Sequence, residues 1–225
     1  MAAINGDDLS MKQYLWAAAL ALAASSAHAN EVYAGLGVPG LQLGYSQAVM
    51  NQVSVRGELA TSGRYTKDTT QEGIDYSGQF KYDRAAVFAD WFVAGNGFRV
   101  TGGLTFNRLR VELEGRGNGG SIDIGSTTYT TTADDRFNVD VKYPTVMPYL
   151  GIGWGHHETA GKGFSFVADL GVSFGKPKVT GSVSGPQLSG VVTQADIDRE
   201  LAEVRNKADD YKVVPQITVG VSYRF

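Results

Sequence analysis

The sequence is most informative at first through what it lacks. Its 225 residues include no cysteine, so no disulfide bond can hold the fold together. Lys and Arg number 20 against 23 Asp and Glu, a formal net charge of −3 that gives no reason to expect a nucleic-acid partner. Beyond the N-terminal region, no apolar run is long enough to form a transmembrane helix. Some other arrangement must therefore stabilise the chain.

Glycine and aromatic residues are the abundant classes. There are 29 Gly, 11 Tyr and 10 Phe, a composition that suits a closed β-sheet better than a helical core. The length alone is compatible with one or two domains. The composition therefore predicts strands, whose side chains alternate between two faces.

The N-terminal region has the features of a targeting segment. A short basic start at residues 11–13 is followed by an apolar run at 14–24 and an A-x-A cleavage site at 27–29. The ten preceding residues contain two aspartates, which do not suit a signal peptide. We expect residues 1–10 to be an upstream extension, 11–29 to be the signal peptide, and 30–225 to be the exported mature protein.

The last fifteen residues have the clearest periodicity. One set of alternate positions is almost wholly apolar and ends on aromatic residues: Val213, Pro215, Ile217, Val219, Val221, Tyr223 and Phe225. The other set is mainly small or polar: Val214, Gln216, Thr218, Gly220, Ser222 and Arg224. Because side chains alternate faces along a strand, this segment is predicted to be a strand with one apolar face.

Seven further segments alternate in the same way. The eight predicted strands are 31–38, 41–48, 53–60, 74–93, 98–113, 146–155, 164–175 and 211–225. Short connections near residues 50, 95 and 160 alternate with long ones at 64–73, 114–143 and 176–210, and only the Pro39-Gly40 turn breaks this pattern. Past Arg108 the apolar phase shifts to Leu109, Val111 and Leu113, which indicates either a β-bulge or an exit from a membrane.

These features resemble the small single-chain outer-membrane β-barrel proteins of Gram-negative bacteria, the OmpA/OmpX/OmpW-like group. The resemblance rests on the signal peptide, the alternating strands and the ending at residues 219–225. It implies an all-β, transmembrane, antiparallel up-and-down barrel of eight strands. It also implies a monomer without cofactors, integral to the outer membrane with a periplasmic C-terminus, in contact with outer-membrane lipid and lipopolysaccharide. The barrel-assembly machinery would read Val219, Val221, Tyr223 and Phe225.

Two groups of side chains follow from this arrangement. An aromatic girdle is predicted at the periplasmic strand ends, made of Trp91, Phe98, Trp154, Phe164, Tyr223 and Phe225. A charge network is predicted in the lumen, made of Arg56, Glu58, Asp90, Arg99, Asp169 and Arg224. Because an eight-stranded barrel is only wide enough for side chains, we expect a plugged, charge-balanced lumen. If so, Glu58→Ala should leave an unpaired cation and lower the unfolding temperature. The alternative role of these charged residues is to line a polar pathway for ions.

One short extracellular helix is predicted within the last long connection. Thr193 could cap it, with Asp196 at the third helical position. Ile197, Leu201, Val204 and Ala208 form a narrow apolar stripe. The helix could pack on the rim of the barrel, or act as a lid or partner-binding element.

Motifs typical of enzymes and metal sites are weak here. Residues 35–40 match G-x-G-x-x-G and residues 171–175 match G-x-S-x-G, but each lies in or beside a predicted strand rather than before a helix. His156 and His157, the only histidines of the mature chain, are expected at the periplasmic rim. We expect no catalytic residue, cofactor or metal, and no enzyme activity.

Three functions are compatible with the sequence. The first is a structural or surface-interaction role through the three long connections. The alternative is a narrow channel for passive uptake of a small or hydrophobic solute, which an apolar lumen patch at Phe88, Phe92 and Tyr149 would favour. The third is a lipid-modifying outer-membrane enzyme. A barrel fold by itself does not choose among them.

Overall fold

The computed structural model describes residues 30–71, 74–93, 97–117, 119–156, 161–209 and 211–225. The predicted leader, His157 and parts of the turns near residues 95 and 160 lie outside these ranges. The strands are β1 (Asn30–Val38), β2 (Leu41–Met50), β3 (Val53–Gln71), β4 (Ile74–Trp91), β5 (Phe98–Arg116), β6 (Ser121–Ile124), β7 (Thr127–Thr130), β8 (Arg136–Lys142), β9 (Val146–Trp154), β10 (Gly163–Phe174), β11 (Lys178–Ser184) and β12 (Val213–Arg224).

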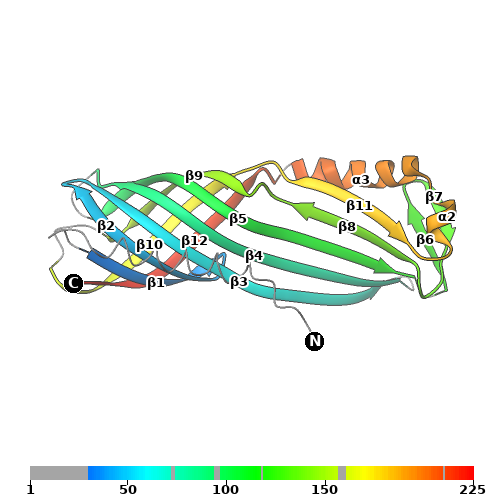
Figure 1. Cartoon of the computed structure of the whole chain (residues 1–225), viewed down its shortest axis with the longest axis horizontal. Helices are drawn as coiled ribbons and strands as arrows, with labels where there is room; N and C mark the ends of the chain where they lie inside the picture. Colours follow the sequence, from blue (N-terminus) through cyan, green and yellow to red (C-terminus); the bar gives the residue numbers. More distant parts are fainter. Residues whose placement is uncertain (1–29, 72–73, 94–96, 118, 157–160, 210) are drawn as a thin grey trace, which may run out of the picture.

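Eight of these strands close into a ring, as Figure 1 shows at the end that carries the C-terminus. Neighbours pair antiparallel in the order β5, β4, β3, β2, β1, β12, β10 and β9, and β5 then pairs with β9 to close the ring. The first and last strands of the ring in the sequence, β1 and β12, pair from Glu31↔Arg224 to Val38↔Ile217. The predicted eight-stranded antiparallel barrel is confirmed.

The alternation of residue types produces two opposite faces on each ring strand. In β12, Ile217 and Val221 are each 56% exposed on the outside, whereas Gln216 and Ser222 are buried. Apolar side chains thus point out of the ring and polar side chains point into it, the reverse of a water-soluble barrel.

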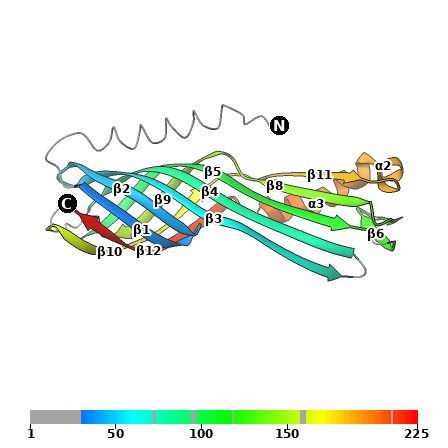
Figure 2. The same ribbon diagram turned by 60° about the horizontal axis from the view of Figure 1, so that its bottom comes forward.

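Three ring strands continue far beyond the ring and form part of a second structure, which we call the extension. Beyond the ring, β5 exchanges its partner β9 for β8, and β8 pairs with β11, so the extension is an open sheet ordered β3, β4, β5, β8 and β11 (Figure 2). The prediction of a loop at 64–73 was wrong, because β3 and β4 stay paired up to Gln71↔Ile74. The long connections at 114–143 and 176–210 likewise contain β6, β7, β8 and β11.

The predicted single helix is one of two described helices, α2 (Leu188–Val191) and α3 (Gln194–Asp209). Thr193 caps α3 as expected: its hydroxyl accepts the Asp196 amide at 3.2 Å and donates to the Asp196 carboxylate at 2.5 Å. Ile197 and Leu201 are buried against β8 and β11 of the extension rather than on the barrel rim. Among the described residues, no helix is long and apolar enough to cross a membrane.

The phase shift on β5 has a clear structural form. The pairing of β4 with β5 runs without irregularity from Asp75↔Arg116 to Trp91↔Val100, so no bulge accompanies the shift. The outward-facing side chains change from the apolar Phe106 to the charged Arg108, and the strand remains regular across this change. Irregular pairing occurs elsewhere in the ring, on β2 between Ala48 and Met50 and on β3 between Thr61 and Arg64.

Two adjacent glycines of β5 offer a matched test of the packing inside the ring. A Cβ on Gly103 would lie 2.3 Å from the Val87 carbonyl oxygen and 2.8 Å from the Phe88 ring, whereas a Cβ on Gly102 meets nothing within 4 Å. We expect Gly103→Ala to lower the free energy of unfolding by about 1–3 kcal/mol through overpacking. Gly102→Ala should be neutral or slightly stabilising. Urea unfolding of the two refolded variants checks this, and equal midpoints would contradict it.

Candidate functional site: a filled lumen and an ordered extension

The ring interior is filled by layers of side chains, beginning near the C-terminus. Glu31 on β1 accepts a hydrogen bond from Arg224 at 2.7 Å and is also bonded to His156 Nδ1. The Tyr33 ring packs edge-on against the His156 ring, with centroids 4.6 Å apart. His156 therefore lies at the predicted end of the barrel, but it is buried in the lumen rather than exposed on the rim.

The second layer joins four predicted network residues. Arg56 on β3 donates to Asp90 at 3.1 Å and to Asp169 at 3.2 Å, and Arg99 donates to Asp169 at 2.6 Å. Asp90 also accepts the Thr101 hydroxyl at 2.6 Å. Because β3 and β10 lie on opposite sides of the ring, the Arg56–Asp169 pair spans the lumen.

The third layer is centred on Glu58. It accepts the Tyr33 hydroxyl at 2.9 Å and pairs with Arg84, which also donates to Gln216 on β12. The guanidinium groups of Arg56 and Arg84 lie 5.1 and 5.8 Å from the centre of the Phe88 ring. The Phe88 ring also packs on Tyr149, with ring centroids 4.7 Å apart, so part of the predicted apolar patch is present but lies beside two cations.

An apolar layer covers these polar layers toward the extension. Tyr82, Leu109, Met147 and Val214 form one buried cluster, and Tyr143 packs against it. One cavity beside the Glu58 layer holds only about 10 Å³, at the lower limit for one water molecule. The lumen is thus a packed interior rather than a pore in this conformation.

The structure places all six predicted network residues inside the ring and adds two more charged residues. Arg56, Arg84, Arg99 and Arg224 are four buried cations, and Glu31, Glu58, Asp90 and Asp169 are four carboxylates that pair with them. Sequence reasoning missed Arg84 and Glu31. Arg84 has the same strand parity as Asp90, so strict alternation along β4 could have found it.

The six predicted girdle residues occupy the opposite face. Trp91, Trp154, Phe164, Tyr223 and Phe225 are 42–80% exposed, and Phe98 is partly exposed and paired with Trp154. Tyr223 pairs with Phe164, and their rings lie 4.9 Å apart. All six lie at the strand ends near the C-terminus.

The weak catalytic motifs are part of the barrel wall. Ser173 is fully buried in β10, where its hydroxyl lies 3.2 Å from Thr105 and accepts the Gln216 amide at 2.6 Å. The G-x-G-x-x-G match is followed by strand β2. Among the described residues, no group of three His, Cys, Asp or Glu is placed to hold a metal.

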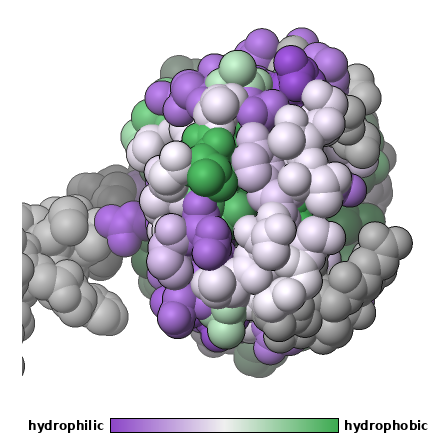
Figure 3. Space-filling model, turned by 90° about the vertical axis from the view of Figure 1, so that its right-hand side faces the viewer, coloured by the Kyte–Doolittle hydropathy of each residue, from purple (hydrophilic) through white to green (hydrophobic). Residues whose placement is uncertain are grey.

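The far end of the extension has a small core of its own. Ile122, Ile124 and Leu188 are buried together, joining the β6–β7 hairpin to α2. Tyr129 on β7 donates to the Asp196 carboxylate at 2.7 Å, which ties the hairpin to α3. Seen end-on, this tip is mostly weakly polar, with a small hydrophobic area (Figure 3).

Asp135 organises the turn beneath this tip. One carboxylate oxygen accepts the amides of Gln187 and Leu188 at 3.0 Å each, and the other accepts the Thr132 amide at 2.7 Å and its hydroxyl at 2.8 Å. Burial raises the pKa of Asp135, but these hydrogen bonds outweigh it and bring the pKa to about 2. A folded-state pKa below the unfolded value, about 3.9, stabilises the turn above pH 4.

We predict that the tip loosens in acid because of Asp135. Its stabilisation is lost as the pH falls from about 4 toward the folded-state pKa of about 2. Asp135→Ala should loosen residues 185–192 at neutral pH and remove that pH dependence. Hydrogen exchange, corrected for intrinsic rates, measures both effects. Asp134→Ala, at the exposed neighbour, is the control, and similar protection in the two variants would contradict the prediction.

Comparison with known proteins supports this architecture at the level of the fold. No family model and no curated protein matches the chain by sequence. The crystal structure of Acinetobacter baumannii CarO2 matches with a TM-score of 0.58 and 18% identity over 89% of this chain and 100% of that one. The fold is that of an outer-membrane β-barrel. Acinetobacter baumannii CarO matches with a TM-score of 0.53 and 18% identity over 87% of this chain and 97% of that one.

A third solved structure shows a weaker likeness. A major outer membrane protein of Thermus thermophilus matches with a TM-score of 0.45 and 16% identity over 89% of this chain and 100% of that one.

Proposed function

We propose that this protein is an integral outer-membrane barrel that holds a rigid extension outside the cell for structural or surface interactions. The observation that carries the proposal is the continuity of β3, β4 and β5 from the ring into an ordered extension with its own cores. In this orientation the C-terminus is periplasmic. The protein acts as a monomer, without enzymatic activity or a cofactor.

The outer surface of the ring supports a place in a bilayer. Large apolar side chains face outward around it, among them Leu36, Leu59, Leu150 and Val219, each 53–63% exposed. Soluble monomers rarely expose a continuous apolar surface of this kind, whereas lipid would cover it. The exposed aromatic side chains near the C-terminus suit one membrane interface.

The layered interior supports a role other than transport or catalysis. Among the described residues, charged side chains are paired across the lumen, and the cavity beside the Glu58 layer holds only about 10 Å³, which leaves no room for a solute at that level. His156 is bonded to Glu31 at the end opposite the extension, and Ser173 is bonded inside the wall. Neither is placed as a nucleophile or base for a substrate in the outer leaflet.

Two kinds of partner follow from the proposal. Outer-membrane lipid, including lipopolysaccharide, surrounds the ring. The barrel-assembly machinery recognises β12 through Val219, Val221, Tyr223 and Phe225, which are 42–56% exposed along one face of the strand.

The proposal is tested in a Gram-negative host that produces the full chain. Protease added to intact cells should cut the extension and spare the turn at Asn51. Cells should adhere to mucin-coated or polystyrene plates more than cells without the protein. Replacing residues 121–130 by a Gly-Ser linker should remove that gain. The same linker inserted after Asn51 should preserve it. Cleavage at Asn51 with the extension spared, or full adhesion without 121–130, would refute the proposal.

A further inference from the structure

The outer face of the sheet changes character abruptly between the ring and the extension. Along β5 the outward residues Leu104 and Phe106 are apolar, and the next outward residue is Arg108. Successive residues on one face of a strand lie about 7 Å apart. If the ring is embedded in a bilayer as proposed above, Arg108 lies at the level of the lipid headgroups.

Cations from four adjacent strands meet at this level. The register pairs Arg64 of β3 with Lys81 of β4, Lys81 with Arg110 of β5, and Arg110 with Lys142 of β8. Together with Arg108 these five residues form what we call the basic belt. Inward neighbours such as Tyr82 and Leu109 are buried on the lumen side, so the belt faces outward.

The acids near the belt are already engaged. Asp83 pairs with Lys81 at 3.0 Å, and Arg110 pairs with Glu112 at 2.6 Å and with Asp140 at 2.8 Å. Within the described ranges, three exposed members of the belt make no ion pair within 4 Å: Arg64, Arg108 and Lys142. Asp83 lies opposite Arg108 in the β4–β5 register, so the belt has five cations against three nearby acids. The belt therefore has an excess of positive charge that this chain does not neutralise.

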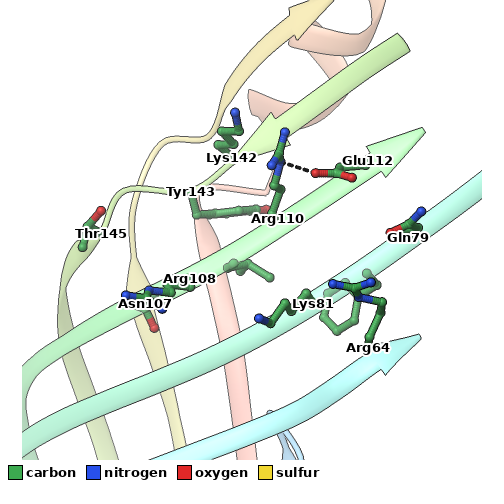
Figure 4. A pocket seen from close by; sticks show the side chains of 12 residues that line it. Arg64, Gln79, Lys81, Asn107, Arg108, Arg110, Glu112, Lys142, Tyr143 and Thr145 are labelled. Carbon is green, nitrogen blue, oxygen red and sulfur yellow. Dashed lines mark ion pairs between the residues drawn. The ribbon is translucent and has the colours of Figure 1, made fainter. Parts of the chain in front are cut away.

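A recess of about 420 Å³ lies among these side chains where β5 passes from β9 to β8 (Figure 4). Arg64, Lys81, Arg108, Arg110 and Lys142 all line it, and Glu112 is its single acidic residue. The rest of the lining consists of uncharged polar and apolar residues: Gln79, Asn107, Thr145, Phe80, Leu109 and Tyr143. Guanidinium groups suit the fork-like recognition of phosphate, and ammonium groups add point charges.

We propose that the basic belt binds the phosphate groups of a phosphorylated glycolipid in the outer leaflet. The belt lies one residue step above the lipid-facing side chains, so a lipid whose acyl chains lie on Phe106 would place its headgroup in the recess. A soluble anion has no acyl chains to pack on Phe106, so this apolar side chain would not contribute to its binding. This inference rests on the proposed membrane placement and adds a defined lipid site to it.

The test uses the full mature chain refolded into phosphatidylcholine vesicles that contain diphosphoryl lipid A or the same lipid freed of its phosphates. Native mass spectrometry after extraction measures the lipid that stays bound. The phosphorylated lipid should be retained well above the dephosphorylated one. Removing three cations in Arg64→Gln/Arg108→Gln/Lys142→Gln should weaken its retention by about 100-fold, since each contributes about fivefold near a charged membrane surface.

A matched variant removes equal charge elsewhere. Arg116→Gln/Arg199→Gln/Arg205→Gln alters three exposed cations of the extension and should retain the lipid like the unaltered protein. Unchanged retention in the belt variant, or equal retention of dephosphorylated lipid, would overturn the site. Full displacement by millimolar inorganic phosphate would indicate a free-phosphate site instead. A chain that fails to insert, and so is wholly digested by protease, would overturn the membrane placement as well.

Discussion

Replacing Asp90 by alanine is expected to lower the free energy of unfolding by about 3–5 kcal/mol, the usual cost of removing one partner from a buried ion pair. Asp90 is fully buried and bonded to Arg56, Arg99 and Thr101. Without Asp90, the buried guanidinium groups of Arg56 and Arg99 have only one carboxylate between them, that of Asp169. Urea unfolding of the refolded protein, followed by the fluorescence of Trp91 and Trp154, measures the change.

Asp83 provides the matched control on the same strand. Asp83 lies seven residues earlier on the outer face of β4. Its carboxylate is 3.0 Å from the ammonium group of Lys81, and the Lys81 side chain is half exposed. Because solvent screens such pairs, Asp83→Ala should change the free energy of unfolding by less than about 1 kcal/mol. The double variant Asp90→Ala/Arg99→Ala restores the charge balance, so it should cost less than the two single changes together. Equal effects of Asp83→Ala and Asp90→Ala would mean that the lumen pairs are not the main stabilising charges.

The ring could be predicted from sequence because the surroundings of its strands are uniform. A strand with lipid on one side and a narrow lumen on the other must alternate apolar and polar residues, as Ile217 and Thr218 do. The extension does not follow this rule, because residues 61–68 of β3 are exposed at every position and no apolar face marks the strand there. The apolar alternation therefore stops where β3 leaves the membrane, although the strand itself continues. For this reason the sequence predicts a loop at residues 64–71.

The lumen layers were only partly predictable for a different reason. Parity along one strand places Arg56, Glu58 and Asp90 on the inside, but it does not say which of them meet. Pairing across the lumen depends on the ring order and the stagger between strands. Thus the contact of Arg84 on β4 with Gln216 on β12 joins residues 132 positions apart. The burial of His156 was not predictable because it depends on a conformation, with φ of 62°, that turns the residue inward just after β9 ends.

The same layers predict that the refolded protein gives no discrete conductance steps in a planar bilayer. Ions would have to pass the Glu31–Arg224 pair, the Arg56–Asp169 pair, the Glu58–Arg84 pair and finally the apolar layer around Met147. Each layer occupies the lumen through contacts between different strands. A lumen of eight strands has no spare width around them.

A variant can separate a filled lumen from a gated one. Glu58→Ala/Arg84→Ala removes one layer without leaving an unpaired charge, and the layers on either side remain. We therefore expect this variant to be as silent as the unaltered protein. Discrete openings of the unaltered protein that change in size when Glu58 and Arg84 are replaced would show that ions pass through this layer. In that case the paired charges would be a selectivity device, and passive solute uptake would become the better account of function.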